Sequence, residues 1–265
     1  MEELKSIALL IDADNTQLSK LESVLEEISV HGRIVVRRAY GNWKKDTLKN
    51  WEAELKRLAI KPQQQFDYTA GKNATDMALV IDAMKLLHRG LYDAFAIVSS
   101  DSDFTPLAIE LRESGIYVIG AGQGTTPEPF RNSCNEFIIL ENLGEDKEAE
   151  DFGKDGKTAE KSGGNAPNGD KADRSSARES EKEKPAAGKA AMKKIHKLLR
   201  LAWEQYQDGN YVHIGAAGSY IKRVNPDFDA RTYGYRNLPK LIEAFPEKYE
   251  LIMSKSSQWL YRCRR

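Results

Sequence analysis

The sequence predicts an α/β protein in which a parallel sheet is covered by helices on both faces, followed by a small helical domain with a terminal hairpin. In residues 1–143, short apolar runs alternate with amphipathic segments, a pattern typical of parallel sheets. Residues 144–188 are rich in charge, glycine and alanine and contain almost no apolar anchor. Residues 189–265 return to helical periodicity. We therefore expect two domains joined by a linker.

The strands and helices of the first domain are expected in alternating order. Apolar runs predict strands at residues 6–11, 33–40, 93–100, 116–122 and 136–142. Apolar side chains at helical spacing predict helices at residues 18–30, 46–60, 74–90 and 104–115, with a short helix near Pro127. In such folds ligands bind beyond the carboxyl ends of the strands.

The second domain shows helical patterns followed by two strand-like runs. Helices are expected at 190–206, 216–224 and 235–245, and strands at 249–252 and 259–263. Three helices and a hairpin describe a winged helix-turn-helix. Such modules bind nucleic acid in some proteins and dock onto proteins in others.

Charge is unevenly distributed along the chain. The formal net charge is zero, with 40 basic and 40 acidic residues, but residues 1–143 carry a balance of −5 and residues 189–265 one of +8. A basic domain is an electrostatic hint of a nucleic-acid partner, although a solvated surface explains it equally well. Residues 144–188 cannot bury enough apolar surface to offset the entropy of ordering, which predicts a flexible linker.

Several protein classes are excluded. No apolar run is long enough to cross a bilayer, and the first apolar segment runs directly into acidic residues, unlike a signal peptide. The two cysteines, Cys134 and Cys263, lie in distant segments, so we expect no disulfide framework and a reducing, cytoplasmic location.

Acidic residues gather where the strands are expected to end. Asp12 and Asp14 follow the first strand, Asp76 lies near the start of a helix, and Asp101 and Asp103 follow the strand at 93–100. Carboxylates gathered at one edge repel each other, and either a raised pKa or a divalent cation relieves the repulsion. Hard oxygen ligands suit Mg²⁺ or Mn²⁺, which activates water and neutralises charge on a phosphate. The pattern predicts a metal site that faces nucleic-acid phosphate.

Each aspartate also has a purely structural interpretation. Asp101 is placed to cap the following helix, Asp76 to favour a helix start, and Asp12 to form a turn. Asp82 lies six positions after Asp76, so on one helix the two point about 120° apart. We expect Asp76 rather than Asp82 to face the cleft, and the direction of Asp14 stays open.

Two residues near this edge are candidates for contact with nucleic acid. Lys72, one turn before Asp76, could meet a phosphate, and a solvated loop lysine is the alternative. Trp43, in the "GNWKK" segment, could stack on a base, although tryptophans more often pack into the protein.

Residues 6–142 resemble the NYN domain, a PIN-like ribonuclease fold. The matching segments are "IDADN", "KNATDMALVIDAM", "VSSDSDFTPLAIELRESG" and "FRNSCNEFIIL", in family order. The resemblance implies metal-dependent RNA cleavage and places the acidic, metal-binding cluster on Asp12, Asp76, Asp101 and Asp103. It also implies that Asn15 orients Asp12 or a water molecule. Family members often carry glycine where Ser100 stands here.

Residues 190–265 resemble a LOTUS domain, also called OST-HTH, through "GSYIKRVNPDFDARTYGYRNLPKLIEAF". The resemblance implies RNA binding, including structured G-rich RNA, and docking to a protein such as a helicase. Expected phosphate contacts, with surface solubility as the alternative, are Arg223, Arg231, Arg236 and Lys240.

Three functions follow from these patterns. The first is an Mg²⁺- or Mn²⁺-dependent ribonuclease to which the C-terminal domain recruits RNA. The second rests on "DADNT", which matches the D-x-D-x-T of haloacid dehalogenase-type phosphatases. The third is a regulatory RNA-binding protein without catalysis.

Overall fold

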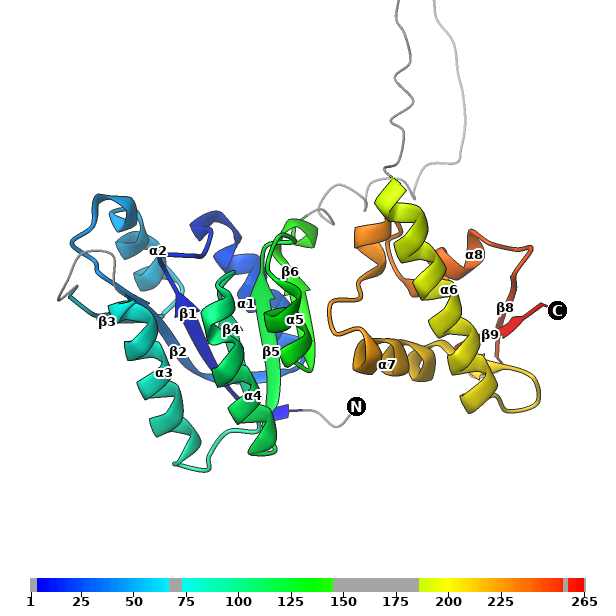
Figure 1. The fold of residues 1–265 in the computed structure, drawn as a ribbon, viewed down its shortest axis with the longest axis horizontal. Coiled ribbons are helices and arrows are strands. Elements are labelled where there is room, and N and C mark those ends of the chain that lie inside the picture. The colour runs from blue at the N-terminus through cyan, green and yellow to red at the C-terminus, as the bar shows by residue number, and fades with distance from the viewer. Residues whose placement is uncertain (1–3, 67–72, 145–185, 255–256, 265) are drawn as a thin grey trace, which may run out of the picture.

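The computed structural model describes residues 4–66, 73–144, 186–254 and 257–264, and the predicted linker at 144–188 lies mostly outside them. The first domain contains six strands: β1 (Leu4–Asp12), β2 (Gly32–Gly41), β3 (Lys61–Gln64), β4 (Ala94–Val98), β5 (Tyr117–Gly122) and β6 (Glu136–Ile139). Its α-helices are α1 (Leu21–Ser29), α2 (Trp51–Arg57), α3 (Ala74–Leu87), α4 (Thr105–Glu113) and α5 (Glu128–Ser133). All six strands pair in parallel, in the order β3-β2-β1-β4-β5-β6 (Figure 1). The predicted α/β class is confirmed.

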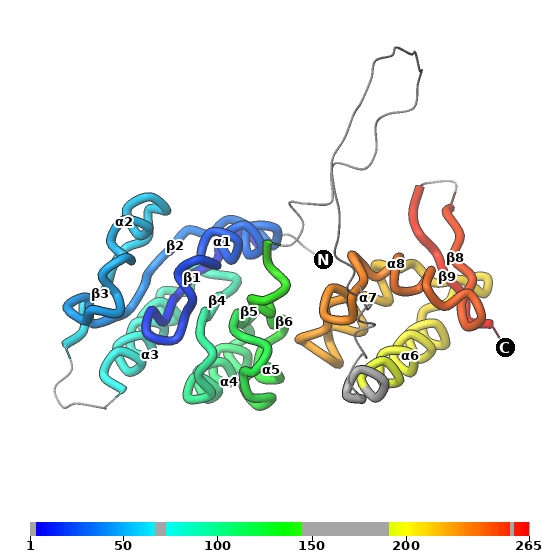
Figure 2. The backbone as a smooth tube through the Cα atoms, turned by 90° about the horizontal axis from the view of Figure 1, so that it is seen from above, coloured from blue at the N-terminus to red at the C-terminus, as the bar shows by residue number. Residues whose placement is uncertain are grey.

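The sheet is the middle layer of three. Helices α1 and α2 cover one face, and α3, α4 and α5 cover the other (Figure 2). The central strand β1 is buried from both sides: Ile7, Leu9 and Ile11 face the first layer, while Ala8 and Leu10 face the second. This double burial explains why its sequence is a continuous apolar run rather than an alternating one.

Two elements differ from the sequence-based expectations. The predicted helix at 46–60 divides into a 3₁₀ turn at Asp46–Leu48 and the shorter α2. Strand β3 was not predicted, because its sequence "KPQQ" is polar and contains Pro62. It lies at the sheet edge, where a proline and exposed polar side chains are tolerated.

The C-terminal region forms a small domain of helices and a three-stranded antiparallel sheet. Its elements are α6 (Ala186–Tyr206), β7 (Val212–His213), α7 (Ile214–Val224), α8 (Leu238–Glu243), β8 (Tyr249–Met253) and β9 (Trp259–Cys263). Strand β9 lies between β7 and β8. The helices and the β8–β9 hairpin were predicted, whereas the two-residue β7 was not. The core includes Ile195, Ile221, Leu241 and Tyr261.

The two domains contact each other along β6 (Figure 1). Both cysteines are free, as expected. In the part of the chain that the structure describes, no helix has the length and apolar character needed to cross a membrane.

Candidate active site

The acidic residues gather where the strand order reverses. Strands β1 and β4 are neighbours, and the chain leaves them toward opposite edges of the sheet. This switch point is where open α/β sheets bind ligands, beyond the carboxyl ends of the strands. Asp12 ends β1, Asp101 follows β4, and Asp76 lies in the first turn of α3.

Asp12 is completely buried and held by three donors. Ser99 Oγ and Asn15 Nδ2 donate to its Oδ2 at 2.7 and 2.9 Å, and the N–H of Asp14 donates to Oδ1 at 3.2 Å. Burial raises the pKa of Asp12, while the hydrogen bonds from Ser99 and Asn15 act in the opposite direction. These contacts orient the carboxylate, and Asn15 is one of the groups that make them.

The raised pKa of Asp76 is the clearest indication that the carboxylates lie close together. Its pKa rises from an ordinary 3.8 to about 6. Partial burial is the largest cause, and repulsion follows from, in order, Asp12, Asp101, Asp14 and Asp103. Carboxylates repel measurably only over short distances in a protein, so the five side chains share one electrostatic site. Asp14, whose direction the sequence left open, belongs to this group.

Asp101 and Asp103 are also engaged in local structure. Asp101 Oδ1 accepts from the N–H of Asp103 at 2.8 Å, and this bond caps a 3₁₀ turn at Ser102–Phe104. Asp103 Oδ2 accepts from Asn73 Nδ2 at 2.9 Å. Among the described residues, no donor reaches the second carboxylate oxygen of Asp101. The cap therefore leaves this oxygen available to a ligand.

The donor set of the site fits a hard divalent cation. Within the described residues, no group of three or more acids, histidines or cysteines is close enough to hold a metal ion as placed. The candidate donors are carboxylate oxygens, which suit Mg²⁺ and Mn²⁺. The repulsion that raises the pKa of Asp76 is the kind that such a cation relieves.

Asp82 lies on the same helix as Asp76 but forms a separate hydrogen-bond network with side chains of β2. Arg38 Nη1 donates to its Oδ2 at 2.5 Å, and the hydroxyl of Tyr40 donates to the same oxygen. Burial acts to raise the pKa of Asp82, but these two hydrogen bonds, together with the positive charges of Arg38 and Lys85, hold the pKa below its ordinary value. Asp82 is thus bonded to side chains of β2, whereas Asp76 is coupled to the other aspartates.

Two residues of the first domain, Trp43 and Lys72, were predicted to contact nucleic acid. Trp43 donates its indole N–H to the carbonyl of Gln63 at 3.1 Å, and its ring lies 6.1 Å from that of Trp51, in contact with the core. This is the packing alternative for a half-buried tryptophan. Lys72 lies outside the described residues.

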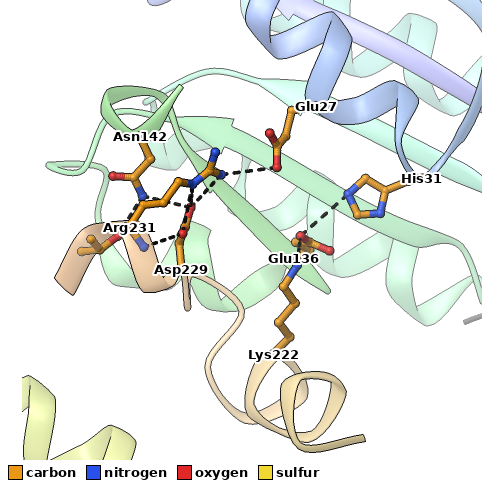
Figure 3. Close-up of polar contacts among 8 residues, drawn as sticks. Glu27, His31, Glu136, Asn142, Lys222, Asp229 and Arg231 are labelled. Atoms are coloured by element: carbon orange, nitrogen blue, oxygen red, sulfur yellow. Dashed lines mark hydrogen bonds and ion pairs between the residues drawn. The ribbon is translucent and has the colours of Figure 1, made fainter. Parts of the chain in front are cut away.

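The four basic residues proposed for the C-terminal domain also differ in their contacts. Arg231 bonds to Asp229 and reaches Glu27 of the first domain at 3.4 Å (Figure 3). Lys240 pairs with Glu243 on the surface. Arg223 bonds to the hydroxyl of Tyr206, and Arg236 lines a small pocket at the domain junction.

Sequence reasoning missed two residues that support the site. Ser99 is buried, donates to Asp12, and accepts from the N–H of Asp101 at 3.0 Å. Asn73, just before α3, holds Asp103. The signal available was their position: Ser99 directly follows β4, and Asn73 precedes Asp76 by three residues.

The chain was compared with solved structures and curated proteins. It is similar to a protein of unknown function from Vibrio parahaemolyticus (15% identity, TM-score 0.44), covering 52% of this chain and 94% of that one. It is also similar to an uncharacterized protein from Nitrosomonas europaea (26%, TM-score 0.26, covering 35% and 91%) and to MurG from Acinetobacter baumannii (15%, TM-score 0.35, covering 50% and 40%). TM-scores this low give these likenesses no weight. A search of curated proteins found no match.

Two protein-family profiles match this chain. The profile of the NYN domain matches residues 6–141, and that of the OST-HTH/LOTUS domain matches residues 189–261. NYN domains are a PIN-like nuclease family, and LOTUS domains bind RNA. The first match spans the whole parallel sheet and its acidic edge. This chain therefore belongs to the NYN domain family and carries a LOTUS domain at its C-terminus.

Proposed function

We propose that this chain is a divalent-metal-dependent ribonuclease that hydrolyses RNA phosphodiester bonds. The observation that carries the proposal is the electrostatic coupling of Asp76 to four other aspartates at the switch point of the sheet. A structural cluster of capping residues has no need to gather four carboxylates around a half-buried fifth one. A site for a cation and a phosphate does, because the cation balances their charge.

The residues that would hold Mg²⁺ or Mn²⁺ are Asp12, Asp76, Asp101 and Asp103. When bound, the ion supplies an activated water molecule and positive charge against the phosphate. The chain itself orients the ligands: Ser99 and Asn15 fix the carboxylate of Asp12, and Asn73 fixes that of Asp103. In the reaction, the oxygen of water bonds to phosphorus, the bond to one ribose oxygen breaks, and that oxygen takes up a proton.

Cleavage of labelled single-stranded RNA tests the proposal. We expect cleavage with Mg²⁺ or Mn²⁺, none with EDTA, and a loss of at least about 10²-fold in Asp12→Asn and Asp76→Asn. The matched control is Asp46→Asn, because this side chain is 86% exposed and forms a surface ion pair with Lys49. If wild type leaves RNA intact with either metal but binds it, the alternative of a non-catalytic RNA-binding protein holds instead.

The phosphatase alternative makes a different prediction at Asp14. In that mechanism Asp14 is the acid/base, and turnover of a small phosphomonoester collapses in Asp14→Asn. Here both carboxylate oxygens of Asp14 lie 3.3 Å from Lys45 Nζ. The ion pair therefore engages both of the oxygens that would have to carry the proton of a general acid. The same variant in the RNA assay separates the two activities.

A further inference from the structure

The edge strand of the first domain is joined to the loop after α7 by backbone and side-chain contacts. The N–H of Phe137 in β6 donates to the carbonyl of Pro226 at 2.9 Å. Glu136, only 5% exposed, pairs with Lys222 of α7 and lies 3.7 Å from His31 (Figure 3). The contacts place α7 next to the start of β6.

Two more ion pairs join the domains at other points of the interface. Arg131 Nη1 lies 2.7 Å from Asp227 Oδ2, and Arg231 Nη2 lies 3.4 Å from Glu27 Oε1. Leaving such partly buried charges unpaired is costly, so the contacts favour one relative orientation of the domains. The surface between them is consequently a defined feature of the molecule.

A cleft of about 1000 Å³ lies at this junction. Both domains contribute to its walls, including Arg112, Tyr117, Lys194, Tyr206, Lys222 and Arg223. Within the described ranges, its lining contains four cationic side chains and no carboxylate. The whole sequence has equal numbers of basic and acidic residues, so this lining is a strong local excess of positive charge.

Three of these four cations have no counter-charge among the residues that the structure describes. Lys222 is balanced by Glu136. Arg112 donates to two backbone carbonyl groups, Lys194 to a side-chain amide oxygen, and Arg223 to a tyrosine hydroxyl. None of the three forms an ion pair with any residue that the structure describes. Cations gathered around an open cleft without carboxylates attract an anionic ligand, and one with several charges most strongly.

We propose that this interdomain cleft binds the phosphate backbone of single-stranded RNA through Arg112, Lys194 and Arg223. The ring of Tyr206 is 39% exposed and lies at the cleft wall, with the guanidinium of Arg223 6.0 Å from the ring centroid. Exposed aromatic side chains of this kind stack on unpaired bases. The bases of single-stranded RNA are free to stack on an aromatic ring, whereas those of a duplex are not. The choice of RNA as the polyanion rests on the proposed function.

This site is distinct from the acidic cluster. Tyr117 in the cleft begins β5 and pairs with Ala94 at the start of β4, whereas Asp101 follows the other end of β4. The five residues of β4 span about 17 Å at a rise of about 3.3 Å each. An RNA held in the cleft must run along the first domain to reach the carboxylates, so the cleft contributes affinity and not chemistry.

Binding of a fluorescent, unstructured RNA oligonucleotide in EDTA, measured by anisotropy over a range of salt concentrations, tests the proposal. In Arg112→Gln/Lys194→Gln/Arg223→Gln we expect at least about tenfold weaker binding. The slope of log K against log salt concentration should become shallower by about 2, because about 0.7 counterion is released per phosphate contact on a single strand. The control variant, Lys56→Gln/Arg57→Gln/Arg200→Gln, changes the net charge equally at exposed sites outside the cleft and should bind as wild type does.

Every outcome of this binding assay either supports or overturns the cleft proposal. Unchanged affinity and slope in the cleft variant, equal loss in the control variant, or no RNA binding by wild type would each overturn the proposal. If the triple variant does not fold, Lys194→Gln/Arg223→Gln retains Arg112 and should still flatten the slope by more than about 1. EDTA prevents cleavage, so this binding result is separate from the nuclease assay. If wild type cleaves RNA but the cleft variant binds RNA normally, the cleft proposal alone is refuted. If wild type does not cleave RNA but the cleft variant binds RNA more weakly, the nuclease proposal alone is refuted.

Discussion

The raised pKa of Asp76 makes a prediction about stability that does not depend on catalysis. In the folded protein this pKa is about 6, against 3.8 for an ordinary aspartate. The folded state therefore binds more protons than the unfolded state between these values, and stability falls as pH rises through this window. Replacing Asp76 by Asn removes this group, so the variant should gain stability relative to wild type as the pH increases.

The size of the effect follows from the pKa. A pKa change from 3.8 to about 6 corresponds to about 3 kcal/mol as an upper limit. Asp76 is half-buried, and solvent screening reduces this figure to about 1 kcal/mol. The relevant quantity is the unfolding free energy of Asp76→Asn minus that of wild type, which should increase by about 1 kcal/mol from about pH 4 to pH 7.5.

Urea unfolding in EDTA at several pH values measures this difference, with Asp46→Asn as a control at an exposed site. In buffer without EDTA, addition of Mn²⁺ at pH 7.5 should stabilise wild type more than the Asp76 variant, because the cation binds only the folded site. A difference that stays constant with pH would refute the electrostatic coupling. Equal stabilisation of both proteins by Mn²⁺ would remove Asp76 from the ligand set.

Three more outcomes follow from the contacts. Tyr40→Phe should lower the unfolding free energy by about 1–2 kcal/mol in urea melts, because Asp82 loses a buried donor; an unchanged value would contradict this network. Ser99→Ala should move the acidic limb of the cleavage pH profile to higher pH, since Asp12 loses a hydrogen bond that lowers its pKa, and a static limb would argue against a role for this carboxylate. Arg231→Ala should increase amide hydrogen exchange at β6, because the domains lose an ion pair, and unaltered exchange would mean that docking does not need it.

The main elements could be predicted because their signals are local. The apolar run of β1 and the helical spacing in α3 reflect burial on two faces and on one face, respectively. Helix geometry was sufficient to favour Asp76 over Asp82. Strand β3 has no such signal, because an edge strand with exposed side chains has little to bury.

The support of the site could not be predicted in the same way. Ser99 lies 87 residues from Asp12, and Asn73 lies 30 residues from Asp103, so neither contact leaves a pattern in a short window of sequence. The domain contact is a stronger example. Arg231 was expected to meet phosphate, and only the docked arrangement brings Glu27, which is 204 residues away, within reach of it.

The sequence by itself predicted the α/β class and the two domains and named the candidate acidic residues, because apolar periodicity and the order of strands and helices indicate which residues reach the carboxyl edge of the sheet. Only the tertiary structure decided how strongly the carboxylates act on one another and which cations remain without counter-charges. Those properties depend on distance and burial, which segments remote in sequence acquire only when they are folded against each other.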